Sequence, residues 1–174
     1  APYGERGDAF VRNRSLKIVQ TLRAHYRVKA IVVACNTATA AAIDTLRAAH
    51  PGLPIVGIEP ALKPATRLSR TGHIGVLATR GTLSSERFAA LAARVAKNCQ
   101  LHLQPCDGLA EAIERLAGTP QPTHKVQTLI DHMVAQLPPL GSAPAHIDTL
   151  VLGCTHYPLA WPHWQQRVQT QARL

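Results

Sequence analysis

Ile31-Val32-Val33-Ala34-Cys35-Asn36-Thr37-Ala38 is the stretch of sequence that decides the fold. Its first four residues are apolar and mostly β-branched, which is typical of a strand in a parallel sheet that is covered on both faces. An alanine-rich segment with helical character, residues 37–49, follows and ends before Pro51. Residues 8–26, before the strand, also carry apolar side chains at helical spacing. The stretch is therefore the junction of a βα unit, and we expect an α/β fold.

The same alternation continues along the rest of the chain. We expect further strands at residues 55–58, 73–78, 100–104 and 149–152, and helices near residues 61–69, 83–97, 109–117, 124–137 and 162–173. Two proline-rich segments, residues 118–122 and 138–141, are predicted to be loops. Both are too short to be flexible interdomain linkers. Strands that alternate with helices in this way predict mainly parallel sheets flanked by helices.

Composition excludes several classes of protein. The chain has 174 residues, of which 46% are hydrophobic and 17% charged, so a disordered protein is excluded. The longest apolar stretch, residues 30–35, is too short to cross a bilayer, and no membrane association is expected. Nineteen Lys and Arg against ten Asp and Glu give a net charge of +9, which permits either an anionic substrate or nucleic acid.

A second stretch, Leu150-Val151-Leu152-Gly153-Cys154-Thr155-His156, repeats the pattern of the first. Each has three branched apolar residues, one small residue, a cysteine and then polar side chains. Ligands of open α/β folds bind outside the carboxyl ends of the strands. We therefore expect Cys35 and Cys154 at such ends, where a helix N-terminus can bind an anion and lower the pKa of a thiol.

Cysteine alone is a weak indication of function, because it often packs as a small apolar residue. Two matching strand ends favour chemistry, since packing does not require the polar residues that follow. Cys99 and Cys106 lack this context and are predicted to be inert, and no pair has zinc-ligand spacing. Reduced thiols indicate a cytoplasmic protein.

One activated cysteine would suggest a thiol hydrolase or transferase. Two equivalent ones suggest acid–base inversion of an amino-acid Cα, with one thiol on each face.

Four segments closely resemble the glutamate racemase family, and they occur in the family's order. They are Pro2-Tyr3-Gly4-Glu5-Arg6, Val32-Val33-Ala34-Cys35-Asn36-Thr37-Ala38, Gly75-Val76-Leu77-Ala78-Thr79 and Leu150-Val151-Leu152-Gly153-Cys154-Thr155-His156-Tyr157-Pro158-Leu159. The resemblance implies interconversion of L- and D-glutamate without cofactor or metal, supplying D-glutamate for peptidoglycan. Aspartate racemases share the two-cysteine plan and stay an alternative.

The resemblance also implies a role for particular residues. Cys35 would take the proton from D-glutamate and Cys154 from L-glutamate, with His156 assisting Cys154. Glu111 would be the carboxylate that supports this side, with Glu114 and Asp107 as nearby alternatives and a solvated helix face as the competing interpretation. The residues expected to hold the substrate are Tyr3, Gly4, Asn36, Thr37, Thr79 and Thr155.

The family fold implies two pseudo-symmetric lobes with the active site between them, which would comprise residues 1–61 and 62–174. The chain departs from the family at both ends. Family members open with a strand that ends in Asp-Ser-Gly and close with a second such segment, and neither is present in the sequence. A truncated chain that binds ligand without turnover is therefore an alternative, and a homodimer is allowed. A nucleic-acid-binding module is disfavoured, because the basic residues are scattered and form no recognised motif.

Overall fold

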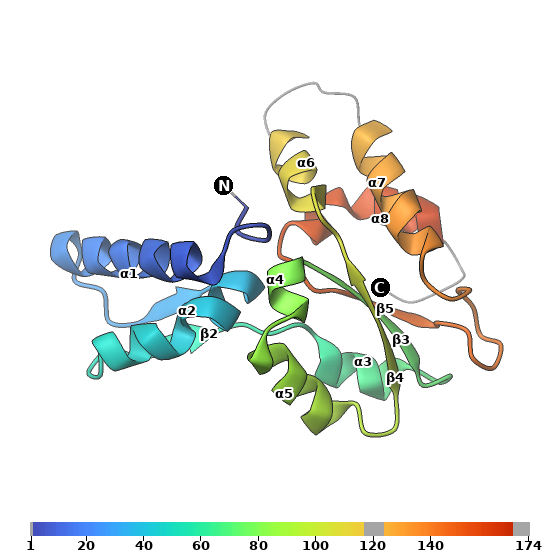
Figure 1. The fold of residues 1–174 in the computed structure, drawn as a ribbon, viewed down its shortest axis with the longest axis horizontal. Helices are drawn as coiled ribbons and strands as arrows, with labels where there is room; N and C mark the ends of the chain where they lie inside the picture. The colour runs from blue at the N-terminus through green and yellow to red at the C-terminus, as the bar shows by residue number, and fades with distance from the viewer. Residues whose placement is uncertain (1, 117–123, 169–174) are drawn as a thin grey trace.

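The computed structural model describes residues 2–116 and 124–168 (Figure 1). Its strands are β1 (Ile31–Val33), β2 (Ile55–Gly57), β3 (His73–Ala78), β4 (Gln100–Pro105) and β5 (Thr149–Leu152). Its helices are α1 (Asp8–His25), α2 (Asn36–Ala49), α3 (Leu62–Leu68), α4 (Arg80–Leu83), α5 (Glu86–Val95), α6 (Leu109–Leu116), α7 (His124–Ala135) and α8 (Trp161–Val168), with a 3₁₀ turn, η1, at Tyr157–Ala160.

All the expected strands and helices are present, with small shifts at their ends. The short helix α4 and the turn η1 were not anticipated. Of the helix predicted at residues 162–173, the part beyond Val168 lies outside the described residues, as does the loop predicted at residues 118–122.

The strands form two separate parallel sheets. One sheet pairs β1 with β2, and the other has the order β4-β3-β5. The strands of the second sheet are far apart in the sequence, and each connection between them runs through helices. The expectation of an α/β fold with parallel sheets flanked by helices is therefore confirmed.

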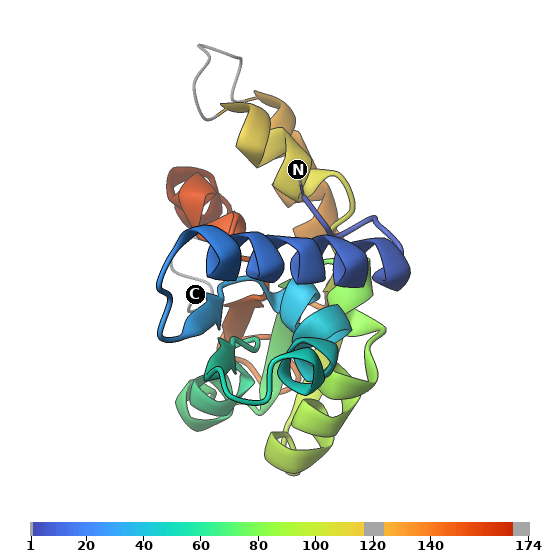
Figure 2. The ribbon, with the colours of Figure 1, turned by 90° about the vertical axis from the view of Figure 1, so that its left-hand side faces the viewer.

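Among the described residues, helices cover one face of the two-stranded sheet and leave the other open. Helices α1 and α2 pack Val19, Ile43 and Leu46 against Ile31 and Ile55 of the two strands (Figures 1 and 2). The neighbouring strand residues point to the other face, where Val32 is 64% and Val56 is 54% exposed. The expectation that residues 31–34 form a strand covered on both faces is therefore wrong at Val32.

The three-stranded sheet is covered on both faces, as parallel sheets usually are. On one face, α6, α7 and α8 pack against Leu77 and Leu150; on the other, α3 and α5 pack against Ile74, Val76 and Val151 (Figure 1). These strand residues are almost entirely buried. The strands of this sheet are therefore held between two layers of packed helices.

The carboxylate of Asp148 stabilises the start of β5. It accepts hydrogen bonds from Ser69 Oγ at 2.6 Å, from the backbone N–H groups of Arg70 at 2.7 Å and Thr71 at 3.1 Å, and from Thr149 Oγ1 at 3.0 Å. Partial burial acts to raise the pKa of Asp148, but these hydrogen bonds outweigh it and lower the pKa to about 2.

We expect Asp148→Ala to lower the free energy of unfolding at pH 7 by about 1–2 kcal/mol, allowing for solvent screening of this partly exposed group. Because the folded pKa lies below the unfolded value of about 3.9, the contribution is complete above about pH 5. It is lost as the pH falls towards about 2. Urea unfolding at pH 7, 4 and 2 should show the difference from wild type shrinking with pH. A difference that is unchanged at pH 2 would contradict the assignment to the ionised carboxylate.

Candidate active site

Cys35 and Cys154 each follow a strand and precede a helical turn, as the repeated pattern predicts. Cys35 is the N-cap residue of α2, and its sulfur accepts a hydrogen bond from the backbone N–H of Ala38 at 3.5 Å. Cys154 lies between β5 and η1, and its backbone carbonyl accepts from the N–H of Tyr157 at 3.1 Å. Cys35 is half-buried, whereas Cys154 is 8% exposed.

The neighbours of the two cysteines meet across the gap between the sheets. Asn36, next to Cys35, donates a hydrogen bond from Nδ2 to the carbonyl oxygen of Gly153, next to Cys154, at 2.8 Å. This contact joins residues 117 positions apart in the sequence. It brings both strand ends to one place, close enough for a charge on Cys35 to affect the ionisation of Cys154.

Three threonine hydroxyls form a buried cluster beside this contact. Thr37 Oγ1 lies 2.9 Å from Thr79 Oγ1 and 3.3 Å from Thr82 Oγ1, and Thr79 donates to Thr82 at 2.9 Å. Thr79 is also the N-cap residue of α4. The expected substrate residues Thr37, in α2, and Thr79, after β3, are therefore brought together, and Thr82 is a member of the cluster that the sequence did not single out.

The thiol of Cys154 holds its proton at neutral pH. Its pKa is raised to about 11, mainly by burial and to a smaller extent by the charge of Cys35, while hydrogen bonds from the backbone N–H groups of His156 and Tyr157 act in the opposite direction. The expectation that the helix N-terminus lowers the pKa of this thiol is therefore wrong, because desolvation is the larger effect.

His156 lies between Cys154 and a carboxylate. Its Nδ1 is 3.8 Å from Cys154 Sγ, and its Nε2 is 3.9 Å from Glu114 Oε2. The carboxylate of Glu111 instead accepts from Arg115 Nη2 at 2.6 Å along α6. Glu111 was the carboxylate expected to support the side of Cys154, with Glu114 and Asp107 as alternatives; of these three, the structure places Glu114 beside His156. Spacing in the sequence could not distinguish Glu111 from Glu114, because both belong to the same short helix.

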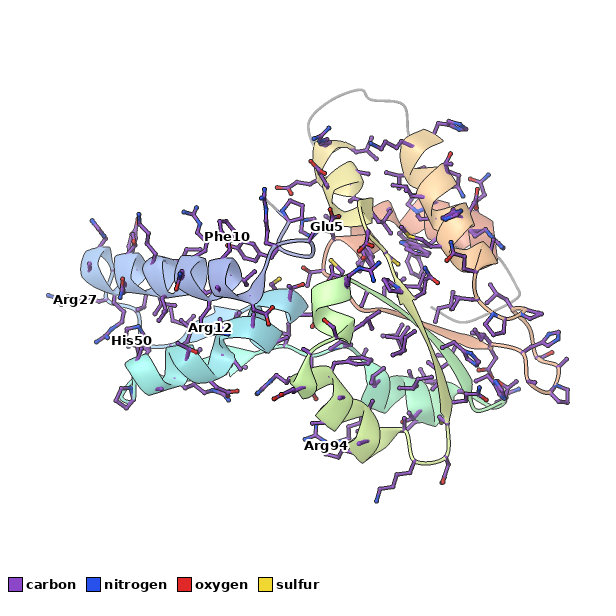
Figure 3. The ribbon with its side chains drawn as sticks, viewed as in Figure 1. Glu5, Phe10, Arg12, Arg27, His50 and Arg94 are labelled. Atoms are coloured by element: carbon purple, nitrogen blue, oxygen red, sulfur yellow. The ribbon has the colours of Figure 1, made fainter. Side chains whose placement is uncertain are left out.

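The segment before α1 reaches the same region. A side chain at Gly4 would collide with Thr79, since a Cβ added there would lie 2.6 Å from Thr79 Cγ2. Tyr3 accepts a hydrogen bond from Arg6 N at 3.0 Å, and its ring packs edge-on against Phe10, which Figure 3 labels at the start of α1, with 6.5 Å between centroids. Tyr3 and Gly4 are therefore held in place by the fold.

Two cavities border this region. One, of about 330 Å³, is lined by residues that include Gly4, Glu5, Thr79, Asp107 and Glu111. The other, of about 220 Å³, is a mostly apolar groove between α1 and β1 that includes Tyr3 and Cys35. Thr155, also expected to hold substrate, is exposed on the turn after Cys154.

Within residues 2–116 and 124–168, no group of three or more His, Cys, Asp or Glu side chains is arranged to hold a metal ion. Among the helices that the structure describes, none is both long and apolar enough to cross a membrane.

Comparison with known proteins identifies the family to which this chain belongs. The family model described as Asp/Glu/Hydantoin racemase matches residues 1–172. The chain therefore belongs to this family of racemases.

Within the family, the relatives are glutamate racemases, as the resemblance implied. The chain is 47% identical over 163 residues to the glutamate racemase of Pseudomonas aeruginosa PAO1, covering 92% of this chain and 57% of that protein. It is 46% identical over 162 residues to that of Ectopseudomonas mendocina, covering 92% of this chain and 58% of the relative. The chain thus spans about three fifths of the length of the curated relatives that it matches.

Solved structures agree. The chain is similar to Escherichia coli glutamate racemase, determined in complex with L-glutamate and the activator UDP-MurNAc-Ala, with a TM-score of 0.81 and 34% identity over 99% of this chain and 63% of the other. Glutamate racemase isoform RacE1 of Bacillus anthracis gives a TM-score of 0.80 and 31% identity, over 100% of this chain and 62% of the other.

Proposed function

We propose that this chain carries the two-thiol site of a cofactor-independent glutamate racemase. The site lies between two lobes, residues 1–61 and 62–174, and interconverts L- and D-glutamate. The observation that carries the proposal is the contact of Asn36 with Gly153, because it holds one cysteine from each lobe at the same place. In the cell the product would be D-glutamate for peptidoglycan, made in the cytoplasm.

The mechanism uses one thiol on each face of Cα. With D-glutamate, the thiolate of Cys35 removes the α-proton, and the thiol of Cys154 delivers a proton to the opposite face of the carbanion. The raised pKa of Cys154, about 11, suits this donor role because the proton is present before the reaction starts. With L-glutamate the roles reverse, and His156 accepts the proton that Cys154 must first lose.

The substrate lies among polar groups from both lobes. Asn36 Oδ1 is buried and has no hydrogen-bond partner among the described residues, while Nδ2 of the same amide is used by Gly153. A buried acceptor without a partner is costly unless a ligand supplies a donor, and the ammonium group of an amino acid is such a donor. Thr155 and the loop of Tyr3 and Gly4 complete the proposed binding residues, and a net charge of +9 favours an anionic substrate.

Glutamate is preferred over aspartate as the substrate because the relatives of this chain are glutamate racemases, one of them solved with L-glutamate bound. An aspartate racemase and a chain that binds glutamate without turnover are the competing proposals.

The test is proton NMR of the wild-type chain with L-glutamate in D2O, with aspartate in a parallel sample. We expect loss of the α-proton signal of glutamate, appearance of D-glutamate, and much slower exchange of aspartate. Faster exchange of aspartate would favour the aspartate racemase. Binding of glutamate without any exchange would show that this chain does not form the complete catalytic unit. The absence of both binding and exchange would contradict the proposal for this chain.

We propose that Glu114, rather than Glu111, supports His156. Its carboxylate lies 3.9 Å from Nε2 and stabilises the positive charge that His156 gains on taking a proton. Glu114→Gln should lower the rate of exchange from L-glutamate by about fivefold, equivalent to about 1 kcal/mol for a partly exposed ion pair. Glu111→Gln, on the same helix, is the matched control and should stay within twofold of wild type. A larger loss of the exchange rate in Glu111→Gln than in Glu114→Gln would instead assign the support of His156 to Glu111.

A further inference from the structure

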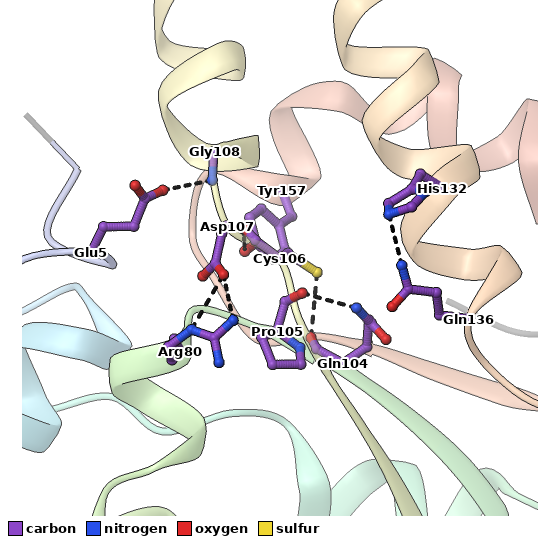
Figure 4. A network of polar contacts seen from close by, with 10 residues as sticks. All are labelled: Glu5, Arg80, Gln104, Pro105, Cys106, Asp107, Gly108, His132, Gln136 and Tyr157. Atoms are coloured by element: carbon purple, nitrogen blue, oxygen red, sulfur yellow. Dashed lines mark hydrogen bonds and ion pairs between the residues drawn. The ribbon is translucent and has the colours of Figure 1, made fainter.

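A network of polar contacts surrounds the turn that precedes α6 (Figure 4). The carboxylate of Glu5 accepts a hydrogen bond from the backbone N–H of Gly108 at 2.6 Å. On the other side of the turn, Arg80 donates to Asp107 Oδ2 through Nε at 3.2 Å and Nη2 at 2.5 Å. The backbone N–H of Cys106 donates to the carbonyl of Ala78 at 2.9 Å. Two other segments of the chain, the one with Glu5 and the one with Ala78 and Arg80, therefore hold this one turn.

Glu5 caps the start of α6 although it is distant from this helix in the sequence. Gly108 directly precedes α6 and has no side chain that could accept from the free N–H groups of the first turn. Its φ of 76° is in the left-handed region, which favours glycine at this position. A carboxylate close to a helix N-terminus also interacts favourably with the helix dipole. Glu5, 103 positions away in the sequence, accepts from the N–H of Gly108 itself and places its carboxylate at this helix end.

Both ends of the Glu5 contact lead to the proposed active site. On one side, Glu5 follows Tyr3 and Gly4, which are proposed to bind substrate. On the other, α6 carries Glu114, which lies beside His156. The fit of Gly4 against Thr79 leaves no room for a Cβ, so even a small movement of the loop changes the wall of the 330 Å³ cavity that these residues line.

We propose that Glu5 is a positioning residue for substrate binding: its carboxylate ties the Tyr3–Gly4 loop to the start of α6 and so sets the position of that loop. The assignment rests on the proposed function. The two thiols are held by other contacts, Cys35 by the N–H of Ala38 and Cys154 by the turn that follows it, so the loss of Glu5 affects binding more than proton transfer.

The test compares Glu5→Ala and Glu5→Gln with wild type in the full chain. Glu5→Ala should raise KM for glutamate about tenfold, the effect of losing a charge-assisted hydrogen bond, and change kcat less than twofold. Glu5→Gln keeps an acceptor oxygen and should recover most of the affinity. In the same samples, the amide proton of Gly108 should exchange with D2O faster in Glu5→Ala than in wild type. Glu86→Ala, an exposed carboxylate at the start of α5, is the control and should change none of these values.

The outcomes separate this proposal from the proposed function. A fall in kcat at constant KM would show a general loss of folded enzyme and overturn the positioning role. An unchanged KM together with faster exchange at Gly108 would also overturn the positioning role. An unchanged Gly108 amide in an active enzyme would overturn the tie itself. If the wild-type chain neither binds nor converts glutamate, the proposed function fails, and an effect on Gly108 then shows that Glu5 is only a helix cap.

Discussion

Replacing either Cys35 or Cys154 by serine should slow racemisation of glutamate by at least about a hundredfold relative to wild type. A serine hydroxyl is a much weaker acid than a thiol, so it is neither deprotonated by its neighbours nor able to return a proton quickly to a carbanion. The two residues act on opposite faces of Cα, and neither can replace the other. Formation of the opposite enantiomer, followed on a chiral column from L- and from D-glutamate, measures the effect.

Cys99→Ser is the matched control, because Cys99 lies before β4 and packs against the apolar cluster beneath α5. It should keep at least half of the wild-type rate. The pH dependence gives a second check: since the pKa of Cys154 is raised to about 11, its thiolate fraction grows about tenfold per pH unit up to that value. The rate from L-glutamate should therefore rise with pH at low substrate. A near-normal rate in either serine variant would refute the two-base mechanism.

The fold was largely predictable because its strands and helices have strong local patterns. Residues 73–78 and 149–152 are mostly apolar runs covered on both faces, and the structure has strands at the same positions. The exposure of Val32 was not predicted, because a short apolar run does not reveal whether both faces of its strand are covered. The helix α4 was missed since it has only four residues, Arg80–Leu83, too few for helical spacing to be recognised.

The places of the candidate residues at strand ends were predictable, but their contacts were less so. Cys35 and Cys154 were expected at strand ends because each follows an apolar strand, but their strands belong to different sheets, so the pattern alone does not show that the two ends meet. The hydrogen bond between Asn36 and Gly153, and that between Glu5 and Gly108, could not be predicted, since each joins residues more than 100 positions apart. The raised pKa of Cys154 depends on burial by residues from several elements, which a local pattern does not show.

Trp164→Ala should lower the free energy of unfolding by about 3–5 kcal/mol, the usual cost of removing a fully buried aromatic side chain. Trp164 is completely buried, its ring centroid lies 6.2 Å from that of Tyr157, and its Nε1 donates to the carbonyl of Tyr157 at 2.9 Å. Tyr157, also fully buried, donates from its backbone N–H to the carbonyl of Cys154. Loss of Trp164 should therefore loosen the turn that carries the second thiol as well as the core.

Trp161 provides the comparison within the same helix, because its side chain is 42% exposed. Trp161→Ala should cost less than about 1 kcal/mol. Trp164→Phe keeps most of the buried area but leaves the Tyr157 carbonyl without its donor, and should cost about 1–2 kcal/mol. Urea unfolding followed by circular dichroism measures all three without relying on tryptophan fluorescence. Equal losses in Trp161→Ala and Trp164→Ala would contradict the packing of α8 against the core, since only the second side chain fills it.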